Sequence, residues 1–350
     1  MSQNVAVFGA YGHTGRFVVT ELRERGFTPL LLGRDEGKLQ ALAASGFDHR
    51  VASVDDPTSL DRALTGAAAV INCAGPFAFT AAPLIEAALR AGIPYVDVAA
   101  EIEAVVDTYT RFSARARTAG VAVVPAMAFF GGFGDLLVTT AMGDWTRADE
   151  AHVAYGLSSW HPTAGTVASG VVSRDRRDGR RVRFTGGRLE YHVADRELPR
   201  IDWDFPAPLG RRSVLDGFSM ADVVTVPSHL SIPEVRSYMT TDAATDLAAA
   251  GTPAPVAVDV LGRSAQRFVV DAVVCSGDRR RRVVVSGQDI YAISAPLAVE
   301  AVRRILAGET RTSGVASAGA IFDAPDFLDA LSAHIVVEAC PTDRMISGAP

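Results

Sequence analysis

Short hydrophobic runs alternate with stretches of helical spacing along the first third of the chain. The runs predict six strands, at 5–8, 29–32, 49–54, 69–73, 95–98 and 121–124. Helical spacing fills the intervals, and Asp56 before Pro57 is typical of a helix start. Strands that alternate with helices form a parallel sheet wrapped by crossover connections. This part is therefore predicted to be an α/β Rossmann-type doubly wound sheet.

The pattern changes after Pro125 to longer, alternating segments. They predict strands at 152–157, 182–191, 234–239, 265–275 and 280–286, followed by helices at 295–307 and 325–331. We expect residues 1–127 to form one domain and residues 128–350 a second α+β domain of mostly antiparallel sheet. The helices at about 295–331 could pack back on the first domain.

Composition excludes several classes of protein. The 350 residues are 48% hydrophobic with a net charge of −6, which fits a globular protein without the basic field that nucleic acid requires. The uncharged stretch 63–85 is broken by glycines and prolines, so no membrane insertion is expected. The seven histidines include no H-x-H or H-E-x-x-H pair, and no metal site is predicted.

Cysteine usage and the N-terminus bear on location. Cys73, Cys275 and Cys340 are far apart and form no C-x-x-C pair, which is typical of a reducing compartment. The chain passes directly into its first strand without a basic leader segment. We therefore expect a cytoplasmic protein.

A glycine run follows the first predicted strand and opens a helix. Gly9, Gly12 and Gly15 have the spacing G-x-x-G-x-x-G, which permits a sharp turn and a close approach of the backbone to a pyrophosphate. The alternative is a mere tight turn, which the position after a strand disfavours. Tyr11, His13 and Thr14 between the glycines are further candidate cofactor contacts.

The end of the second strand bears on the choice of dinucleotide. An NAD site usually has an acidic residue there, whereas Arg34 after Gly33 suits a 2′-phosphate, with Lys38 one turn later. NADP(H) is the predicted cofactor, although Asp35 could bind the ribose instead, as in NAD enzymes, and Arg34 could be a plain surface charge. Asp55 is a candidate adenine contact or a helix cap. The segment after strand four would run beside the cofactor; it comprises Cys73, Ala74, Gly75 and Pro76.

Hydride transfer requires a general acid, and one common solution is missing. Lys38 is the only lysine and has no tyrosine four residues before it, so the Tyr-x-x-x-Lys mechanism is excluded. The remaining acids are Tyr155, His161, Tyr191, His192, His229 and Tyr291. His161 is the first choice and His229 the second, with Tyr291 also retained, although a lone histidine is more often structural.

Several segments together resemble the saccharopine dehydrogenase-like oxidoreductases, a family that includes saccharopine reductases and trans-acting enoyl reductases of lipid and polyketide pathways. The resemblance rests on the Gly9–Gly15 loop, 32–34 with 38–39, 72–77, 95–97 with Glu101, and 125 through 134–136. Weaker matches lie at 165–169 and 287–291. Ala99-Ala100 and 126–132 depart from the family pattern, so substrate identity is not carried over.

Residues 1–127 are therefore expected to be the NADP-binding domain. The resemblance implies that residues 128–350 form the substrate domain and close a cleft at the carboxyl ends of the Rossmann strands. Candidates to line this cleft are Tyr95, Asp97, Glu101, Phe129, Phe130, Phe133 and Asp135, with Tyr155 and Trp160 from the second domain. The phenylalanines could equally be core residues, and Asp97 and Glu101 could cap the following helix.

These observations favour an NADPH-dependent reductase acting on an enoyl, imine or carbonyl group of a secondary-metabolite or lipid intermediate. A non-catalytic NADP(H)-binding sensor or scaffold and a saccharopine-type amino-acid dehydrogenase are the alternatives. The arginine-rich run 174–183 is expected to be a solvated hairpin or turn, or else a dock for a carrier protein or anionic group. Substrate would be a small or carrier-bound molecule, and the sequence leaves a homo-oligomer open.

Overall fold

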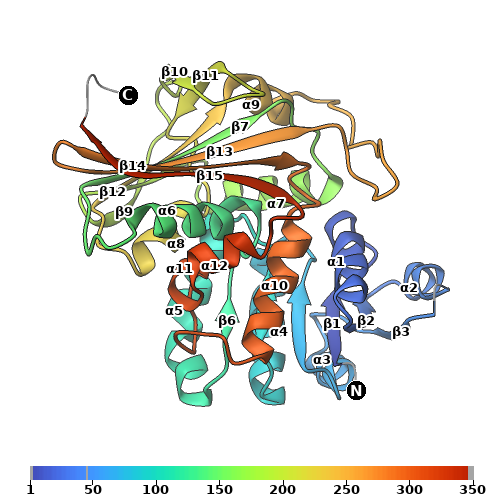
Figure 1. Cartoon of the computed structure of the whole chain (residues 1–350). Helices are drawn as coiled ribbons and strands as arrows, with labels where there is room; N and C mark the ends of the chain where they lie inside the picture. The colour runs from blue at the N-terminus through green and yellow to red at the C-terminus, as the bar shows by residue number, and fades with distance from the viewer. Residues whose placement is uncertain (1–2, 45, 346–350) are drawn as a thin grey trace.

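The computed structural model describes residues 3–44 and 46–345 of the chain, and Figure 1 shows two layered parts. Residues 1–2, 45 and 346–350, which fall within the two predicted domains, lie outside the described residues. The parallel sheet and its helices form one part, and a large second sheet lies across one end of it.

The first part is a six-stranded sheet in the order β3-β2-β1-β4-β5-β6, with every pair parallel. Its elements are β1 (Asn4–Phe8), α1 (His13–Glu24), β2 (Thr28–Gly33), α2 (Glu36–Ala43), β3 (Asp48–Val51), α3 (Pro57–Leu64), β4 (Ala69–Asn72), α4 (Phe77–Ala91), β5 (Tyr95–Asp97), α5 (Ile102–Ala119) and β6 (Val123–Val124). The predicted Rossmann-type sheet is confirmed. Asp56 also caps α3 as predicted, by accepting from the Thr58 and Ser59 amides.

The strands bury both faces, because helices cover the sheet on both sides. Alternate residues such as Val5 and Val7 pack with α1 and with a helix from the far end of the chain, α10 (Ser294–Leu306). The intervening residues, such as Ala6 and Phe8, pack against α3, α4 and α5. A helix from the second half of the sequence thus completes the first layer.

The second part is a nine-stranded, mostly antiparallel sheet, as predicted, in which only β7 and β12 pair in parallel. Its strands are β7 (Glu150–Leu157), β8 (Arg181–Thr185), β9 (Arg188–His192), β10 (Arg200–Asp204), β11 (Arg211–Asp216), β12 (Glu234–Thr240), β13 (Arg267–Ser276), β14 (Arg279–Gln288) and β15 (Ile335–Met345). Its helices are η1 (Phe129–Phe133), α6 (Gly134–Met142), α7 (Ala164–Arg176), α8 (Asp222–Thr225), η2 (Val226–Ser228), α9 (Thr241–Ala248), α11 (Ala318–Ile321) and α12 (Ala324–Asp329). Helix α6 packs on β13 and β14 and faces the first part.

The prediction of one strand over 182–191 is wrong. Gly186 and Gly187 both have positive φ, at 57° and 75°, and turn the chain into the β8–β9 hairpin. Strands β10, β11 and β15 and helices α6, α7, α8, α9 and α11 were not predicted from the sequence. Strands β10 and β11 are rich in charged residues, and α7 buries only Ser173, so none of the three has a long apolar face. Among the described residues, no helix is both long and apolar enough to cross a membrane.

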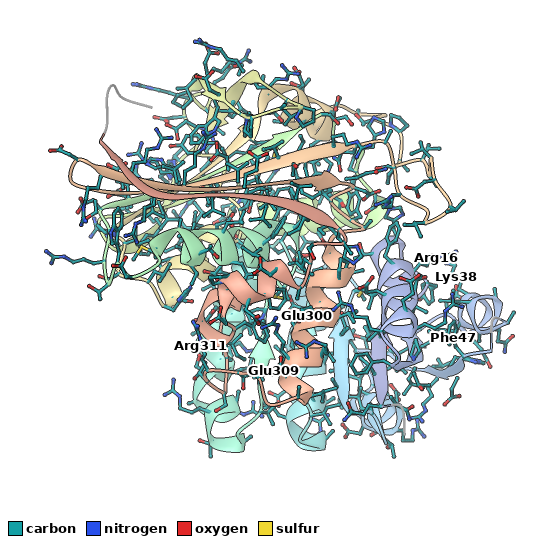
Figure 2. All side chains as sticks on the ribbon, in the orientation of Figure 1. Arg16, Lys38, Phe47, Glu300, Glu309 and Arg311 are labelled. Carbon is teal, nitrogen blue, oxygen red and sulfur yellow. The ribbon has the colours of Figure 1, made fainter. Side chains whose placement is uncertain are left out.

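A buried carboxylate joins α10 to α1. Glu300 of α10 is 1% exposed and pairs with Arg25 of α1 and with Arg303 and Arg304 of its own helix, while Glu309 pairs with Arg303 near the surface (Figure 2). Burial alone would raise the pKa of Glu300, but hydrogen bonds from Arg303 and Arg304 outweigh it and lower the pKa. The ion pairs fix α1, and with it the glycine loop at its start.

We predict that Glu300→Gln lowers the free energy of unfolding by about 2 kcal/mol, because Arg25, Arg303 and Arg304 lose the buried carboxylate that they share. Each of them keeps a second acidic partner, and these are Glu21, Glu309 and Asp326. The matched change Glu309→Gln should cost under about 1 kcal/mol, because that pair is half-exposed. Urea denaturation measures both. Since the folded pKa of Glu300 is depressed, its contribution is present above the unfolded pKa and is lost as pH falls through the folded pKa. Equal losses in the two variants, or a Glu300 effect that persists in acid, would contradict this assignment.

Candidate functional site

The glycine loop between β1 and α1 is held by close backbone contacts. Gly9 has φ +83°, and a Cβ there would lie 2.9 Å from the Cβ of Ala74. A Cβ on Gly15 would lie 2.2 Å from the carbonyl oxygen of Gly9. Neither position accepts a side chain without moving the backbone. The loop therefore lies directly beside the segment after β4.

The start of α1 presents unsatisfied amides. Gly12 is the N-cap and has no side chain to cap the helix. In the described part of the chain, no carbonyl accepts from the N–H groups of His13, Thr14 or Gly15. Such a terminus binds anions, because the amides and the helix dipole both favour negative charge. The buried Nε2 of His13 also lacks a hydrogen-bond partner among the residues described. These groups fit the pyrophosphate of a dinucleotide.

The residues after β2 show which charged side chain is free to contact the dinucleotide, Arg34 or Asp35. Asp35 accepts from the Lys38 amide at 3.0 Å and lies 3.3 Å from Lys38 Nζ, so it caps α2. The Lys38 amide is the largest cause of the lowered pKa of Asp35. Arg34 is exposed and has no side-chain partner among the described residues. Lys38 Nζ also lies 5.6 Å from the centre of the Tyr11 ring. Arg34, rather than Asp35, is thus available to a ligand.

Two other predicted cofactor contacts lie at the same edge. Asp55 is exposed and lies four residues beyond the end of β3, hydrogen-bonded only to nearby Ser53, so adenine contact stays a prediction. The Cys73 amide donates to the Phe8 carbonyl at 2.8 Å, which ties the segment after β4 to β1. Burial raises the pKa of the Cys73 thiol, which disfavours the thiolate that a nucleophile requires.

A buried polar network supports this segment from below. Asn72 donates to Tyr95 and Thr80, both at 3.1 Å, and accepts from the Ala74 amide at 3.0 Å. The Tyr95 hydroxyl donates to Asp97 at 2.9 Å. The network is completely buried and shapes the turn beside the glycine loop. Sequence reasoning missed Asn72, for which the available signal was an amide at the end of a wholly apolar strand.

The structure places Asp97 and Glu101 as supports of the backbone. Asp97 accepts from the Ala99 and Ala126 amides, and burial raises its pKa to about 6. Glu101 accepts from the Phe77 and Ala78 amides at 2.7 and 3.0 Å, so it caps α4. The side chain of Glu101 therefore caps α4, and the expected alternative that it caps the following helix, α5, is wrong. Substrate contact by either residue remains a prediction.

The predicted aromatic lining is packed in the interior. Phe129, Phe130, Phe133, Tyr155 and Trp160 are each at most 6% exposed. Phe130 stacks on Trp160 with ring centres 5.0 Å apart, and the Tyr155 hydroxyl donates to buried Asp222 at 2.8 Å. Burial raises the pKa of Asp222 to about 7. These side chains pack in the protein interior, so they could contact substrate only if the structure around them opened locally.

The three candidate acids have different surroundings. His229 Nε2 lies 2.7 Å from Asp135, which is fully buried and also accepts from the Gly319 amide. Burial disfavours charge on His229, but Asp135 outweighs it and raises the pKa. The Tyr291 hydroxyl is bonded to Trp160, Thr163 and Thr166. His161 is half-buried, and its side chain has no partner among the residues that the structure describes.

Helix α7 brings the second part onto the cofactor edge. A Cβ on Gly75 would lie 2.6 Å from the hydroxyl oxygen of Ser169, so α7 packs directly on the segment after β4. His13 of the glycine loop contacts Tyr291, with ring centres 5.2 Å apart. The predicted residues of the glycine loop, the segment after β4, the loop before α7 and Tyr291 therefore meet at one edge of the sheet.

The arginine-rich run 174–183 was expected to be a hairpin or turn, but it does not form a single such element. It comprises the last turn of α7, a short turn and the start of β8. Arg176 and Arg177 pair with Asp107 and Glu103 of α5. A pocket of about 240 Å³ lies there, lined by equal numbers of basic and acidic residues together with Val106 and Tyr191. The described residues include no cluster of three or more potential metal ligands.

Comparisons with known proteins agree with this geometry. Residues 5–124 match the family model of the saccharopine dehydrogenase NADP-binding domain. A human saccharopine dehydrogenase-like oxidoreductase is 26% identical over 146 residues, which is 36% of this chain and 34% of that protein. A probable mitochondrial one from Arabidopsis thaliana is 30% identical over 143 residues, covering 36% and 32%. These matches show that residues 5–124 are similar to the NADP-binding domain of saccharopine dehydrogenase-like oxidoreductases.

The matched region spans about a third of the length of the curated relatives. The fold extends the likeness further. The structure of saccharopine dehydrogenase (L-Glu forming) from Saccharomyces cerevisiae has a TM-score of 0.65 and covers 97% of this chain and 100% of its own, at 11% identity. At this identity the comparison shows the fold alone. The resemblance to this family and the NADP(H) cofactor expected from the sequence are confirmed in the first part of the chain.

We predict that Arg34→Ala raises the dissociation constant of NADPH roughly tenfold or more and that of NADH less than about twofold. The reason is the loss of charge-assisted hydrogen bonds to the 2′-phosphate, which only NADPH carries. Calorimetric titration measures both constants. Arg62→Ala on α3 is the control for a lost surface arginine. Equal weakening of both dinucleotides would mean that Arg34 does not contact the 2′-phosphate.

Proposed function

We propose that the chain is an NADPH-dependent reductase that transfers hydride to an enoyl, imine or carbonyl group of a secondary-metabolite or lipid intermediate, which reaches the site as a small or carrier-bound molecule in the cytoplasm. The observation that carries the proposal is the contact of α7 and Tyr291 with the glycine loop and the segment after β4. This contact brings α7 to the cofactor edge, where the helix could shield a nicotinamide and a second reactant from water.

The groups at this edge favour an uncharged substrate. Its contacts involve Ala74, Gly75, Ser169, Thr163 and Thr166, none of which is charged. An amino-acid substrate of the saccharopine type needs arginines to hold its carboxylates. Of the arginines near this edge, Arg16 donates to the Tyr11 carbonyl, and Arg176 and Arg177 at the end of α7 are paired with α5. The saccharopine-type alternative is therefore the weaker one.

Bound NADPH would supply the hydride, and the chain must hold the acceptor and supply a proton. His161 suits the second task, because it lies in the loop between β7 and α7 and its imidazole is unpaired among the described residues. Its carbonyl also lies at the Tyr291 hydroxyl. His229 and Tyr291 are less suitable, since each already has fixed partners.

A non-catalytic NADP(H)-binding sensor or scaffold is the second candidate. It is favoured by the engagement of two of the three candidate acids in structural bonds. Such a protein would bind NADPH with the same Arg34 dependence but would never oxidise it.

The proposal predicts substrate-dependent loss of NADPH absorbance with an enoyl thioester, a cyclic imine or a ketone, and none with L-glutamate plus an aldehyde, the reactants that the saccharopine-type alternative would use. His161→Gln should lower kcat roughly 100-fold and leave the NADPH dissociation constant unchanged, because general acids contribute about that much. His192→Gln on β9 is the matched control. NADPH binding without oxidation by any acceptor would support the sensor. Turnover that His161→Gln leaves intact would remove His161 as the acid.

A further inference from the structure

His13 occupies an unusual position for a polar ring. It is the first residue of α1, and its ring stands edge-on to Phe17 and to Tyr291, with ring centres 5.4 and 5.2 Å apart. Its Nε2 is buried and has no partner among the residues described. A buried nitrogen without a hydrogen bond is costly, and such atoms in native proteins usually await a ligand or water.

The surroundings define the chemistry of the missing partner. The unsatisfied amides at the start of α1 adjoin the ring, and Arg16 of α1 and Asp289 of the β14–α10 turn are the charged groups that face it. Burial lowers the pKa of His13, so the ring is neutral at neutral pH and can donate one N–H. An oxygen of a pyrophosphate suits both the amides and this N–H.

Tyr291 connects this ring to α7. Its hydroxyl accepts from the Trp160 indole and the Thr163 amide, both at 3.2 Å, and lies 3.0 Å from the Thr166 hydroxyl. Thr163 is the N-cap of α7 and accepts from the Thr166 amide at 3.1 Å. The start of α7 is therefore hydrogen-bonded to Tyr291, and the ring of Tyr291 packs against His13.

Helix α7 has few other anchors. Of its thirteen residues only Ser173 is buried, and Val167 and Val171 are more than half exposed. Glycines at 165 and 170 further weaken it. Helices with so few buried contacts open locally at low free-energy cost. Its position over Gly75 thus depends on the Tyr291 hydroxyl at one end and on Ser173, Arg176 and Arg177 at the other.

We propose that His13 binds the cofactor pyrophosphate through Nε2 and that, through Tyr291, it couples cofactor binding to the placement of α7 over the reaction edge. The inference rests on the proposed function. Dinucleotide binding fixes the His13 ring, the ring fixes Tyr291, and the tyrosine hydroxyl holds the first turn of α7. His13 is the ligand-contacting residue and Tyr291 a positioning residue.

The first test separates the pyrophosphate from the adenosine end. His13→Phe keeps an aromatic ring between Phe17 and Tyr291 but removes Nε2. We expect it to weaken NADPH roughly tenfold or more and to change binding of 2′-AMP, which lacks the pyrophosphate, by less than about twofold. His192→Phe on β9 is the matched control, because His192 also has a buried, unpartnered ring nitrogen in the described residues. In the wild-type chain, nitrogen-15 NMR should show one histidine Nε2 shifting with NADPH and not with 2′-AMP.

The second test concerns α7. Hydrogen exchange over 164–176 should slow by roughly tenfold when NADPH binds the wild type, since local opening then requires release of a bound contact. Tyr291→Phe keeps the ring against His13 but lacks the hydroxyl, so it should bind NADPH within about threefold of wild type and lose this protection. In the reductase assay it should raise KM more than it lowers kcat.

These experiments distinguish a failure of this inference from a failure of the proposed function. Wild-type protein that fails to bind NADPH would overturn the proposed function and the inference with it. NADPH binding that His13→Phe leaves unchanged, or that weakens equally for 2′-AMP, would overturn the pyrophosphate contact alone. The coupling would be overturned if NADPH did not slow amide hydrogen exchange over 164–176, or if NADPH slowed it equally in Tyr291→Phe and in the wild type.

Discussion

The close approach of α1 to the carbonyl of Gly9 governs the arrangement of the site. With no side chain at Gly15, the helix starts immediately after β1, and its unsatisfied amides lie beside Ala74 and Gly75 at the carboxyl edge of the sheet. The Glu300 ion pairs hold the other end of α1 against α10. The anion-binding terminus, the segment after β4 and the covering helix α7 all depend on this turn.

Buried polar groups at the same edge serve mainly to shape the backbone. Asn72, Tyr95 and Asp97 form one hydrogen-bonded network, and Glu101 caps α4. Each group is satisfied within the protein, which is what makes its burial tolerable. The groups left for ligands are few: the amides of α1, the Nε2 of His13 and the side chains of Arg34 and His161. This division separates the scaffold from the candidate chemistry.

The sequence was most informative where one local rule decides the structure. Alternating apolar runs and the glycine spacing predicted the parallel sheet and its cofactor edge, because both follow from short-range geometry. Roles that depend on distant partners were out of reach. Nothing near Glu101 in sequence indicates that it caps α4, and nothing near Tyr291 indicates that it holds the start of α7. Helix α7 was missed because its stability comes from such contacts and not from an apolar face.

We infer that the carboxyl edge of the first sheet, between the glycine loop and α7, holds NADP(H). A crystal structure of the NADP⁺ complex would decide this. We expect the pyrophosphate at the start of α1 with His13 Nε2 in hydrogen-bond contact, the 2′-phosphate at Arg34, and the nicotinamide between Gly75 and α7. A 2′-position directed to Asp35, or a dinucleotide bound away from this edge, would contradict it.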